Sequence, residues 1–257
     1  MLRGNLNRLT KIILSAIIFF TSCDKDDSIV SENEISLDTD IAIPVVNSDS
    51  CYLVLNNQDI IYAEGLSHDA YSASPFSIPL KLDVYTPDNS SINKPVFMFI
   101  HGGGFNGGTK QKPEIVAMAN YYASRGWVFV SIDYRTSQVL GVIEGMSPKE
   151  ILTYYRGIVP EEWIENALEG AQSLDQFKQA IAMYLAQRDA KAALRWIVAN
   201  SEAYKINKDF ITVGGASAGA ITTIALGISN QEDFRDEIPI SFDHTLSTTN
   251  LNETYSV

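Results

Sequence analysis

Histidine and cysteine are scarce in this chain, and their scarcity restricts its chemistry. The 257 residues contain three histidines and two cysteines. The histidines, His68, His101 and His244, are far apart in the sequence, and neither they nor the cysteines have the spacing of a zinc site. The common phosphate-binding glycine patterns are absent as well. We therefore expect no metal and no cofactor.

Basic residues are outnumbered. There are 19 lysines and arginines against 31 aspartates and glutamates, which gives a formal net charge of -12. A protein that binds nucleic acid needs basic surface to neutralise phosphates. The acidic balance therefore indicates no nucleic-acid partner.

A long apolar run is missing at the start of the chain, where residues 12–20 form only a short one. A helix that crosses a bilayer needs about 20 residues. Because Arg3, Arg8 and Lys11 precede the short run, this segment has the charged region and the apolar region of a secretory signal.

Thr21 and Ser22 directly precede Cys23, and this arrangement resembles a bacterial lipoprotein signal. The resemblance implies that residues 1–22 are removed and that Cys23 carries lipid, which would anchor the protein to a membrane of the cell envelope. Residues 24–27, three aspartates and one lysine, are similar to the surface-export signal of Bacteroidota lipoproteins, which would place the protein at the outer-membrane surface, or they are a solvated charge run. The alternative for Cys23 is a chance cysteine after an ordinary signal peptide.

Residues 23–50 are polar and acidic without lasting periodicity, so we interpret them as a flexible tether before a folded domain at 51–257. Cys51 lies beside the apolar stretch 52–55 and has no histidine near it in the sequence. We therefore expect a buried structural thiol rather than a nucleophile. If Cys23 carries lipid, Cys51 has no partner for an internal disulfide.

A strand, a sharp turn and a helix are predicted around Ser217. Residues 210–213 are apolar and β-branched, as in a buried parallel strand, and 220–226 can continue as a helix. Between them, 215–219 reads Gly-Ala-Ser-Ala-Gly, the G-x-S-x-G pattern of a nucleophile elbow, in which a strained turn exposes a serine. The pattern alone also fits an ordinary turn built from small residues.

A second glycine cluster follows the apolar strand predicted at 95–100. Residues 101–105 read His-Gly-Gly-Gly-Phe. Three consecutive glycines can turn their amides towards one point, as an oxyanion hole requires. A flexible loop without chemistry is the alternative.

These two clusters, with Asp-Tyr-Arg at 133–135 between them, resemble the α/β-hydrolase esterases and lipases, especially the hormone-sensitive-lipase-like and carboxylesterase branches. The resemblance implies a serine-dependent carboxylic-ester hydrolase that acts on a small-molecule ester. Ser217 would be the nucleophile, and the backbone amides of Gly103, Gly104 and Ala218 would form the oxyanion hole.

Within the Asp-Tyr-Arg segment, the resemblance implies that Asp133 is structural and is not the catalytic acid. Arg135 is expected to brace a loop rather than to bind a substrate.

The fold class predicted by these patterns is α/β, an α/β-hydrolase with a mostly parallel, doubly wound sheet and helices on both faces. Strands are expected at 52–55, 60–63, 81–85, 95–100, 127–132 and 210–213, and helices at 113–124 and 187–197. Residues 136–180 carry helix-start signals at Ser147, Pro160 and Ser173, and we interpret this stretch as an inserted helical lid.

The catalytic acid and base are not assigned, because the sequence departs here from the resembled family, which places both well after the serine. His244 is the only histidine that follows Ser217, and Asp233, Asp236 and Asp243 precede it. The distance from Ser217 to His244 is about one βαβ unit, so His244 is a weak candidate for the base and is expected to be a loop residue. We therefore expect the chain to be the N-terminal portion of such a hydrolase, incomplete at the C-terminus.

Two other functions stay open. A non-catalytic or inactive envelope lipoprotein would keep the fold for binding. A serine peptidase or amidase would use the same elbow, although the glycine cluster favours esters.

Overall fold

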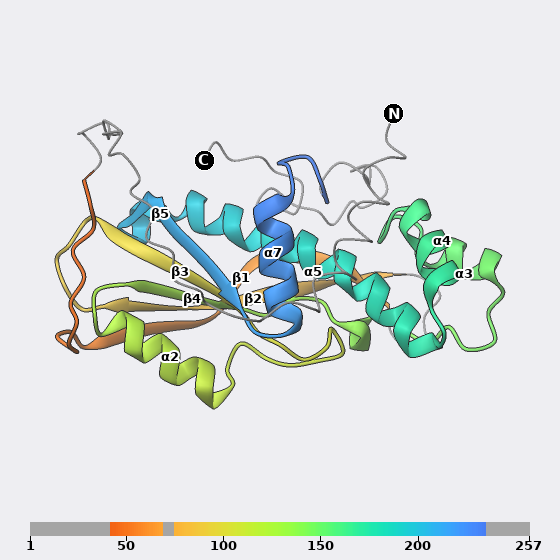
Figure 1. Ribbon diagram of the computed structural model, residues 1–257, viewed down its shortest axis with the longest axis horizontal. Coiled ribbons are helices and arrows are strands. Elements are labelled where there is room, and N and C mark those ends of the chain that lie inside the picture. The colour runs from red at the N-terminus through yellow and green to blue at the C-terminus, as the bar shows by residue number, and fades with distance from the viewer. Residues whose placement is uncertain (1–41, 69–74, 235–257) are drawn as a thin grey trace, which may run out of the picture. The chain divides into compact units, whose positions relative to one another are not determined.

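The computed structural model describes residues 42–68 and 75–234, and it contains a five-stranded sheet (Figure 1). In sheet order the strands are β1 (Val54–Ser67), β2 (Phe76–Pro87), β4 (Val128–Ile132), β3 (Lys94–Ile100) and β5 (Ile206–Gly215). β3 lies between β4 and β5 and is parallel to both, whereas β2 pairs antiparallel with β1 and β4. The α/β fold class is confirmed, and the antiparallel part of the sheet is larger than predicted.

The central strands were predictable because both of their faces are covered. Every residue of β4 is buried, as are all residues of β3 except Phe97. A strand buried on both faces reads as a continuous apolar run, without the alternation of a half-exposed strand.

Helices cover both faces of the sheet (Figure 1). On one face, α2 (Pro113–Ala123) packs its buried residues Ile115 and Ala119 against Phe99 and Phe129. On the other lie α5 (Leu174–Ala199) and α7 (Ala218–Ile228). The helix predicted at 113–124 is confirmed, with Pro113 at its first turn, where a missing N–H costs nothing.

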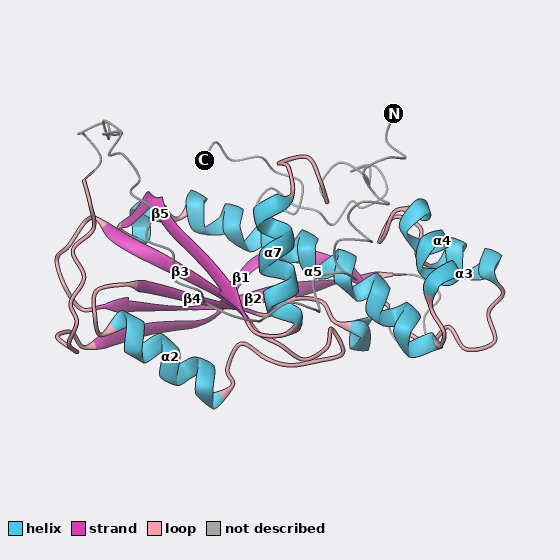
Figure 2. Ribbon diagram, in the orientation of Figure 1, coloured by secondary structure: helices cyan, strands magenta, loops and turns pink. Residues whose placement is uncertain are grey.

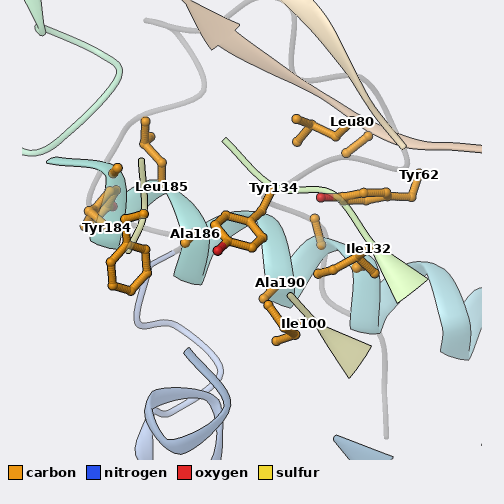
Figure 3. Close-up of a cluster of buried hydrophobic side chains, with 14 of the residues drawn as sticks. Tyr62, Leu80, Ile100, Ile132, Tyr134, Tyr184, Leu185, Ala186 and Ala190 are labelled. Atoms are coloured by element: carbon orange, nitrogen blue, oxygen red, sulfur yellow. The ribbon is translucent and has the colours of Figure 1, made fainter. Parts of the chain in front are cut away.

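The larger core joins α5 to the sheet. Figure 3 shows part of this core, in which Ile100 and Ile132, at the ends of β3 and β4, share one buried cluster with Ala186 and Ala190 of α5. Each fully buried isoleucine contributes roughly 1.5–3 kcal/mol relative to exposure. The sheet end that carries the candidate site is therefore fixed on a rigid support.

The stretch between β4 and α5 contains η1 (Ser137–Val139), α3 (Pro148–Tyr154) and α4 (Glu161–Gly170) (Figure 2). The predicted capping box is present, since Ser147 and Glu150 bond to each other's backbone amides. The helix that begins after Ser173 continues through the predicted crossover helix, so both belong to α5. Its first residue, Leu174, is 46 % exposed. The role of this stretch as a lid stays a prediction.

The first strand differs from its prediction. Instead of two strands at 52–55 and 60–63, β1 runs from Val54 to Ser67, with an irregularity between Asn57 and Ile60. Asp59, inside the irregularity, has a φ of 56°. A bulge of this kind breaks the alternation of side chains, so one strand resembles two in the sequence.

Cys51 is exposed, so the expectation of a buried thiol is wrong. Its backbone N–H is bonded to the carbonyl of Ser124, which holds the chain at the surface just before β1. Residues 42–50, which were interpreted as tether, also bond to the domain: Asn47 N–H donates to Arg125, and Asn93 Nδ2 donates to the carbonyl of Ala42.

The remaining helix of the described residues is α6 (Ser201–Tyr204), which directly precedes β5. None of the helices within 42–68 and 75–234 combines the length and the apolar character needed to cross a membrane.

Candidate active site

Ser217 lies in a strained turn between β5 and α7. β5 ends at Gly215 and α7 begins at Ala218, and Ser217 between them has φ 51° and ψ −116°. A non-glycine residue in a sparsely populated region of this kind costs on the order of 1–3 kcal/mol and is typical of active sites. The residue is exposed. The turn therefore presents the hydroxyl group to solvent, as the elbow pattern predicts.

The two glycines of the elbow are required by close backbone contacts. A Cβ atom at Gly219 would lie 2.0 Å from the carbonyl oxygen of Ile100, at the end of β3. A Cβ atom at Gly215 would lie 2.4 Å from the carbonyl group of Gly219. Only glycine therefore allows strand and helix to meet this closely.

The loop at 101–105 touches the elbow through its backbone. A Cβ atom at Gly102 would lie 2.6 Å from the carbonyl oxygen of Ala216 and 3.1 Å from Cβ of Ser217. Gly103 has a φ of 151° and Gly104 a φ of 61°, and a Cβ atom at Gly103 would lie 1.8 Å from the carbonyl oxygen of Gly107. The glycines thus let the loop pass directly beside the serine.

Three backbone amides at this junction have no acceptor among the described residues. They are those of Gly103, Gly104 and Ala218, the residues expected to form an oxyanion hole. Ala218 begins α7, whose first amides have no partner within the helix and lie at the positive end of its dipole. The elbow and the loop therefore bring free donors and an exposed hydroxyl group into one region.

His101 supports the loop and does not contact Ser217. Its ring is 1 % exposed and stacks on Tyr134 at 4.4 Å between ring centroids. Nδ1 lies 3.1 Å from the carbonyl oxygen of Gly102, and since a carbonyl only accepts, Nδ1 carries the proton. Burial lowers the pKa of His101, although the Gly102 bond and the charge of Asp133 act against this shift. The histidine is therefore neutral at neutral pH.

Asp133 binds the segment that follows the loop. Its Oδ1 accepts the backbone N–H of Lys110 at 2.7 Å and lies 3.7 Å from Nε2 of His101. The carbonyl oxygen of Asp133 accepts from Tyr62 Oη at 2.7 Å. These contacts agree with a structural role.

Arg135 braces the structure from inside, as expected. Its Nε lies 3.0 Å from Oδ2 of Asp189, and Nη1 donates to the carbonyl of Leu66 at 3.0 Å. Both charged side chains are buried. The guanidinium group is therefore engaged by partners inside the fold.

A general base for Ser217 is not found in the described part of the chain. Nε2 of His68 lies 2.8 Å from the carbonyl oxygen of Tyr154, and the His68 ring stacks on the Tyr154 ring. His101 is bonded to Gly102. His244 lies outside the described residues. Within the described ranges, no side chain is hydrogen-bonded to the Ser217 hydroxyl group.

Of the three aspartates that follow Ser217 and precede His244, the structure describes one. Asp236 and Asp243 lie outside the described residues. Asp233 is described, and its carboxylate accepts the backbone N–H of Asn230 at 2.8 Å.

A family model matches this architecture. The model described as BD-FAE matches residues 82–144 and 177–255, more than half of the chain, and covers both glycine clusters. The chain belongs to the BD-FAE family. The family match omits residues 145–176, which carry α3 and α4.

Two curated relatives are esterase or hydrolase proteins by name. The chain is 30% identical over 148 residues to a para-nitrobenzyl esterase of Bacillus subtilis, which covers 57% of this chain and 24% of the relative. It is 27% identical over 147 residues to a phenmedipham hydrolase of Pseudarthrobacter oxydans, and this alignment covers 57% of this chain and 22% of the relative. The matched stretch thus spans about a quarter of the length of each.

Solved structures of esterases are also similar. A butyrate-bound esterase of Thermogutta terrifontis, Est2, shares 20% identity with a TM-score of 0.39, over 58% of this chain and 39% of that chain.

Lys110, which follows the glycine loop at 101–105, forms a network with three aspartates that the sequence patterns did not indicate. Lys110 is 3 % exposed, and its Nζ lies 2.8 Å from Asp59, 3.2 Å from Asp83 and 3.5 Å from Asp133. Burial acts to lower the pKa of Lys110, but the hydrogen bonds and charges of these carboxylates outweigh it and raise that pKa. The network fixes the segment after the glycines to β1, β2 and the end of β4.

Lys112 was missed as well. It precedes α2, and its Nζ donates to the carbonyl oxygen of Gly102 at 3.0 Å. The only local sign of a special role is its position directly before the first proline of a helix. A cation is unfavourable at a helix N-terminus, so a lysine is unexpected there.

Proposed function

We propose that this BD-FAE protein is a serine-dependent carboxylic-ester hydrolase. The observation that carries the proposal is the junction at Ser217, where the exposed hydroxyl group of a strained turn lies beside a loop whose amides have no other acceptor within the described ranges. The printed names of the curated relatives, an esterase and a hydrolase, support the same class.

In the proposed reaction Oγ of Ser217 attacks the ester carbonyl carbon and loses its proton to a base. The carbonyl oxygen becomes an oxyanion, which the amides of Gly103, Gly104 and Ala218 stabilise. The tetrahedral intermediate then expels the alcohol, which takes up a proton, and water hydrolyses the acyl-enzyme. Removal of one oxyanion donor in enzymes of this type costs about 10²–10³ in kcat.

The base belongs to the part of the protein that the structure does not describe. His244 is the candidate on this chain, since it follows Ser217 and lies within the matched family range 177–255. Its replacement by alanine in the full chain tests the assignment. If turnover is unchanged in His244→Ala, the histidine is not the base.

The nucleophile is tested with Ser217→Ala and a matched control, Ser229→Ala. Ser229 is a partly buried serine at the other end of α7, bonded to Leu226. We measure hydrolysis of p-nitrophenyl acetate and labelling by a fluorophosphonate probe. Turnover and labelling are expected to disappear in the first variant and to persist in the second. Ser217-independent turnover, or no labelling of the parent chain, overturns the proposal.

A non-catalytic binding role is the rival, because the described residues offer Ser217 no base. It predicts a folded, unreactive parent chain in the same assay. A peptidase or amidase activity would appear as turnover of a p-nitroanilide at least equal to that of the ester.

For the location, we propose that Cys23 carries lipid and anchors the protein in the cell envelope. This part of the chain lies outside the described residues, and the proposal depends on the charged, apolar and small residues that precede Cys23. A small-molecule ester is the expected substrate class.

A further inference from the structure

Lys112 occupies a position that does not favour lysine. It is the N-cap residue of α2, and its side chain makes no capping bond. Serine, threonine, aspartate and asparagine are preferred there, and the positive end of the helix dipole disfavours a cation. Lys110, another cation, is two residues away. A lysine that conflicts with its local environment in this way requires another reason to be present.

The backbone of Lys112 is held firmly. Its carbonyl oxygen accepts the N–H groups of Ile115 and Val116 at 2.9 and 3.0 Å, and the following Pro113 restricts it to an extended conformation. Two residues earlier, the carbonyl oxygen of Lys110 accepts from Oγ of Ser131 at 2.9 Å. The side chain of Lys112 therefore extends from a fixed point.

The ammonium group of Lys112 binds the peptide unit next to the elbow. Nζ donates to the carbonyl oxygen of Gly102 at 3.0 Å. That carbonyl and the N–H of Gly103 belong to one planar trans peptide and point in opposite directions. A bond that fixes the carbonyl therefore also fixes the direction of the Gly103 N–H, which is one of the proposed oxyanion donors.

A second donor reaches the same carbonyl. Nδ1–H of His101 lies 3.1 Å from the Gly102 oxygen. Gly108 leaves the room for this contact, since a Cβ atom there would lie 2.5 Å from Nδ1 of His101 and 2.7 Å from the Gly102 oxygen. Two donors, one of them charged, thus hold one carbonyl group whose own peptide has glycine on both sides.

We propose that Lys112 is a positioning residue that orients and polarises the Gly102–Gly103 peptide for oxyanion binding. This inference rests on the proposed function. A cation at the carbonyl end draws electron density from the amide and makes its N–H a stronger donor, as in a chain of hydrogen bonds that polarise one another. The effect is larger on a transition state that carries full negative charge than on a neutral ester, so it acts on kcat more than on KM.

The test compares Lys112→Met and Lys112→Arg with a matched control, Lys178→Met. Lys178, near the start of α5, also donates from Nζ to a glycine carbonyl at 2.7 Å, that of Gly141 between η1 and α3. Hydrolysis of p-nitrophenyl acetate by the full chain is measured over a range of substrate concentrations. Lys112→Met is expected to lower kcat by about 10–100-fold with little change in KM, less than the loss of a whole donor. Arginine is expected to restore most of kcat, and the control to keep it.

Three results overturn the inference: kcat of Lys112→Met within twofold of the parent, an equal loss in Lys178→Met, or a loss only in KM. Ser217→Ala separates this inference from the proposed function, because a parent chain whose turnover does not depend on Ser217 refutes that function alone. The amide resonance of Gly103, observed with ¹⁵N-glycine labelling, then tests the positioning directly. It is expected to move upfield in Lys112→Met and to stay in place in Lys178→Met, and an unmoved resonance refutes the role.

Discussion

Arg135 and Asp189 form a buried ion pair that ties the end of β4 to the middle of α5. The two side chains are 3 % and 0 % exposed, and the Asp189 carboxylate also accepts the backbone N–H of Arg135 at 2.8 Å. Arg135 directly follows Tyr134 in the sequence, and the Tyr134 hydroxyl group donates to the carbonyl oxygen of His101 at 2.9 Å. The residue that opens the glycine loop is thus supported from the helix behind the sheet.

Asp189→Asn is expected to destabilise the fold by about 3–5 kcal/mol, because it leaves the guanidinium group of Arg135 buried without its counter-charge. Urea unfolding measures the change, with Asp175→Asn in the first turn of α5 as the control. The double variant Arg135→Met/Asp189→Leu is expected to recover much of the loss, since it removes both charges. A loss below about 1 kcal/mol in Asp189→Asn contradicts the prediction.

Acid is expected to weaken the fold through His101. Burial lowers the pKa of this histidine in the folded state, so folding favours the neutral ring. The stabilisation is present above the unfolded pKa, about 6.5, and is lost as the pH falls from there towards the lower folded pKa. Urea unfolding at pH 7.5 and pH 5.5 should show a larger loss for the parent chain than for His101→Asn, which keeps a donor but does not titrate.

Equal losses in the two proteins would show that other groups cause the acid sensitivity. Asp59 is the natural comparison, because its bond to Lys110 lowers the pKa of its carboxyl group, so that its contribution is lost at more acidic pH.

The parts of the fold that the sequence predicted are those fixed by neighbouring residues. The strands at 95–100 and 127–132 are short apolar runs, and α2 starts at a proline. Ser217 and Gly103 could be named as candidates because an elbow and a glycine loop are local patterns. Local steric requirements of this kind are visible in a few consecutive residues.

The supporting network was not predictable, because its members meet only in the fold. Lys110 contacts Asp59 and Asp83, which come from the bulge of β1 and from β2. No spacing in the sequence marks residues that far apart. The error at Cys51 has a related cause, since the carbonyl of Ser124 holds that residue at the surface although apolar residues follow it.

Lipid modification of Cys23 is expected to be removed by Cys23→Ala and to survive Cys51→Ala. Both cysteines are in the chain, but only Cys23 follows charged, apolar and small residues in that order. Metabolic labelling of bacteria that express the full chain with an alkyne fatty acid measures the modification. Label that persists in Cys23→Ala would show that another residue carries the lipid, and a parent chain without label would show that the signal is an ordinary secretory one.

Gly103→Ala is expected to reduce kcat by about 10²–10³, because a displaced loop amide no longer meets the oxyanion. At this position the added Cβ atom would lie 1.8 Å from the carbonyl oxygen of Gly107, and φ is 151°, so the loop has to move. Gly145→Ala is the matched control, since Gly145 also has a positive φ, 81°, but no atom within 4 Å of its added Cβ.

Both variants carry the strain of an alanine at positive φ, so both are expected to lose stability in urea unfolding. Only the loop variant should lose turnover of p-nitrophenyl acetate. If Gly103→Ala remains folded and keeps the kcat of the parent, the Gly103 amide is not an oxyanion donor. The proposed role of Lys112 in positioning that amide would then fail as well. An equal fall of kcat in Gly145→Ala would assign the effect to general strain instead of to the loop.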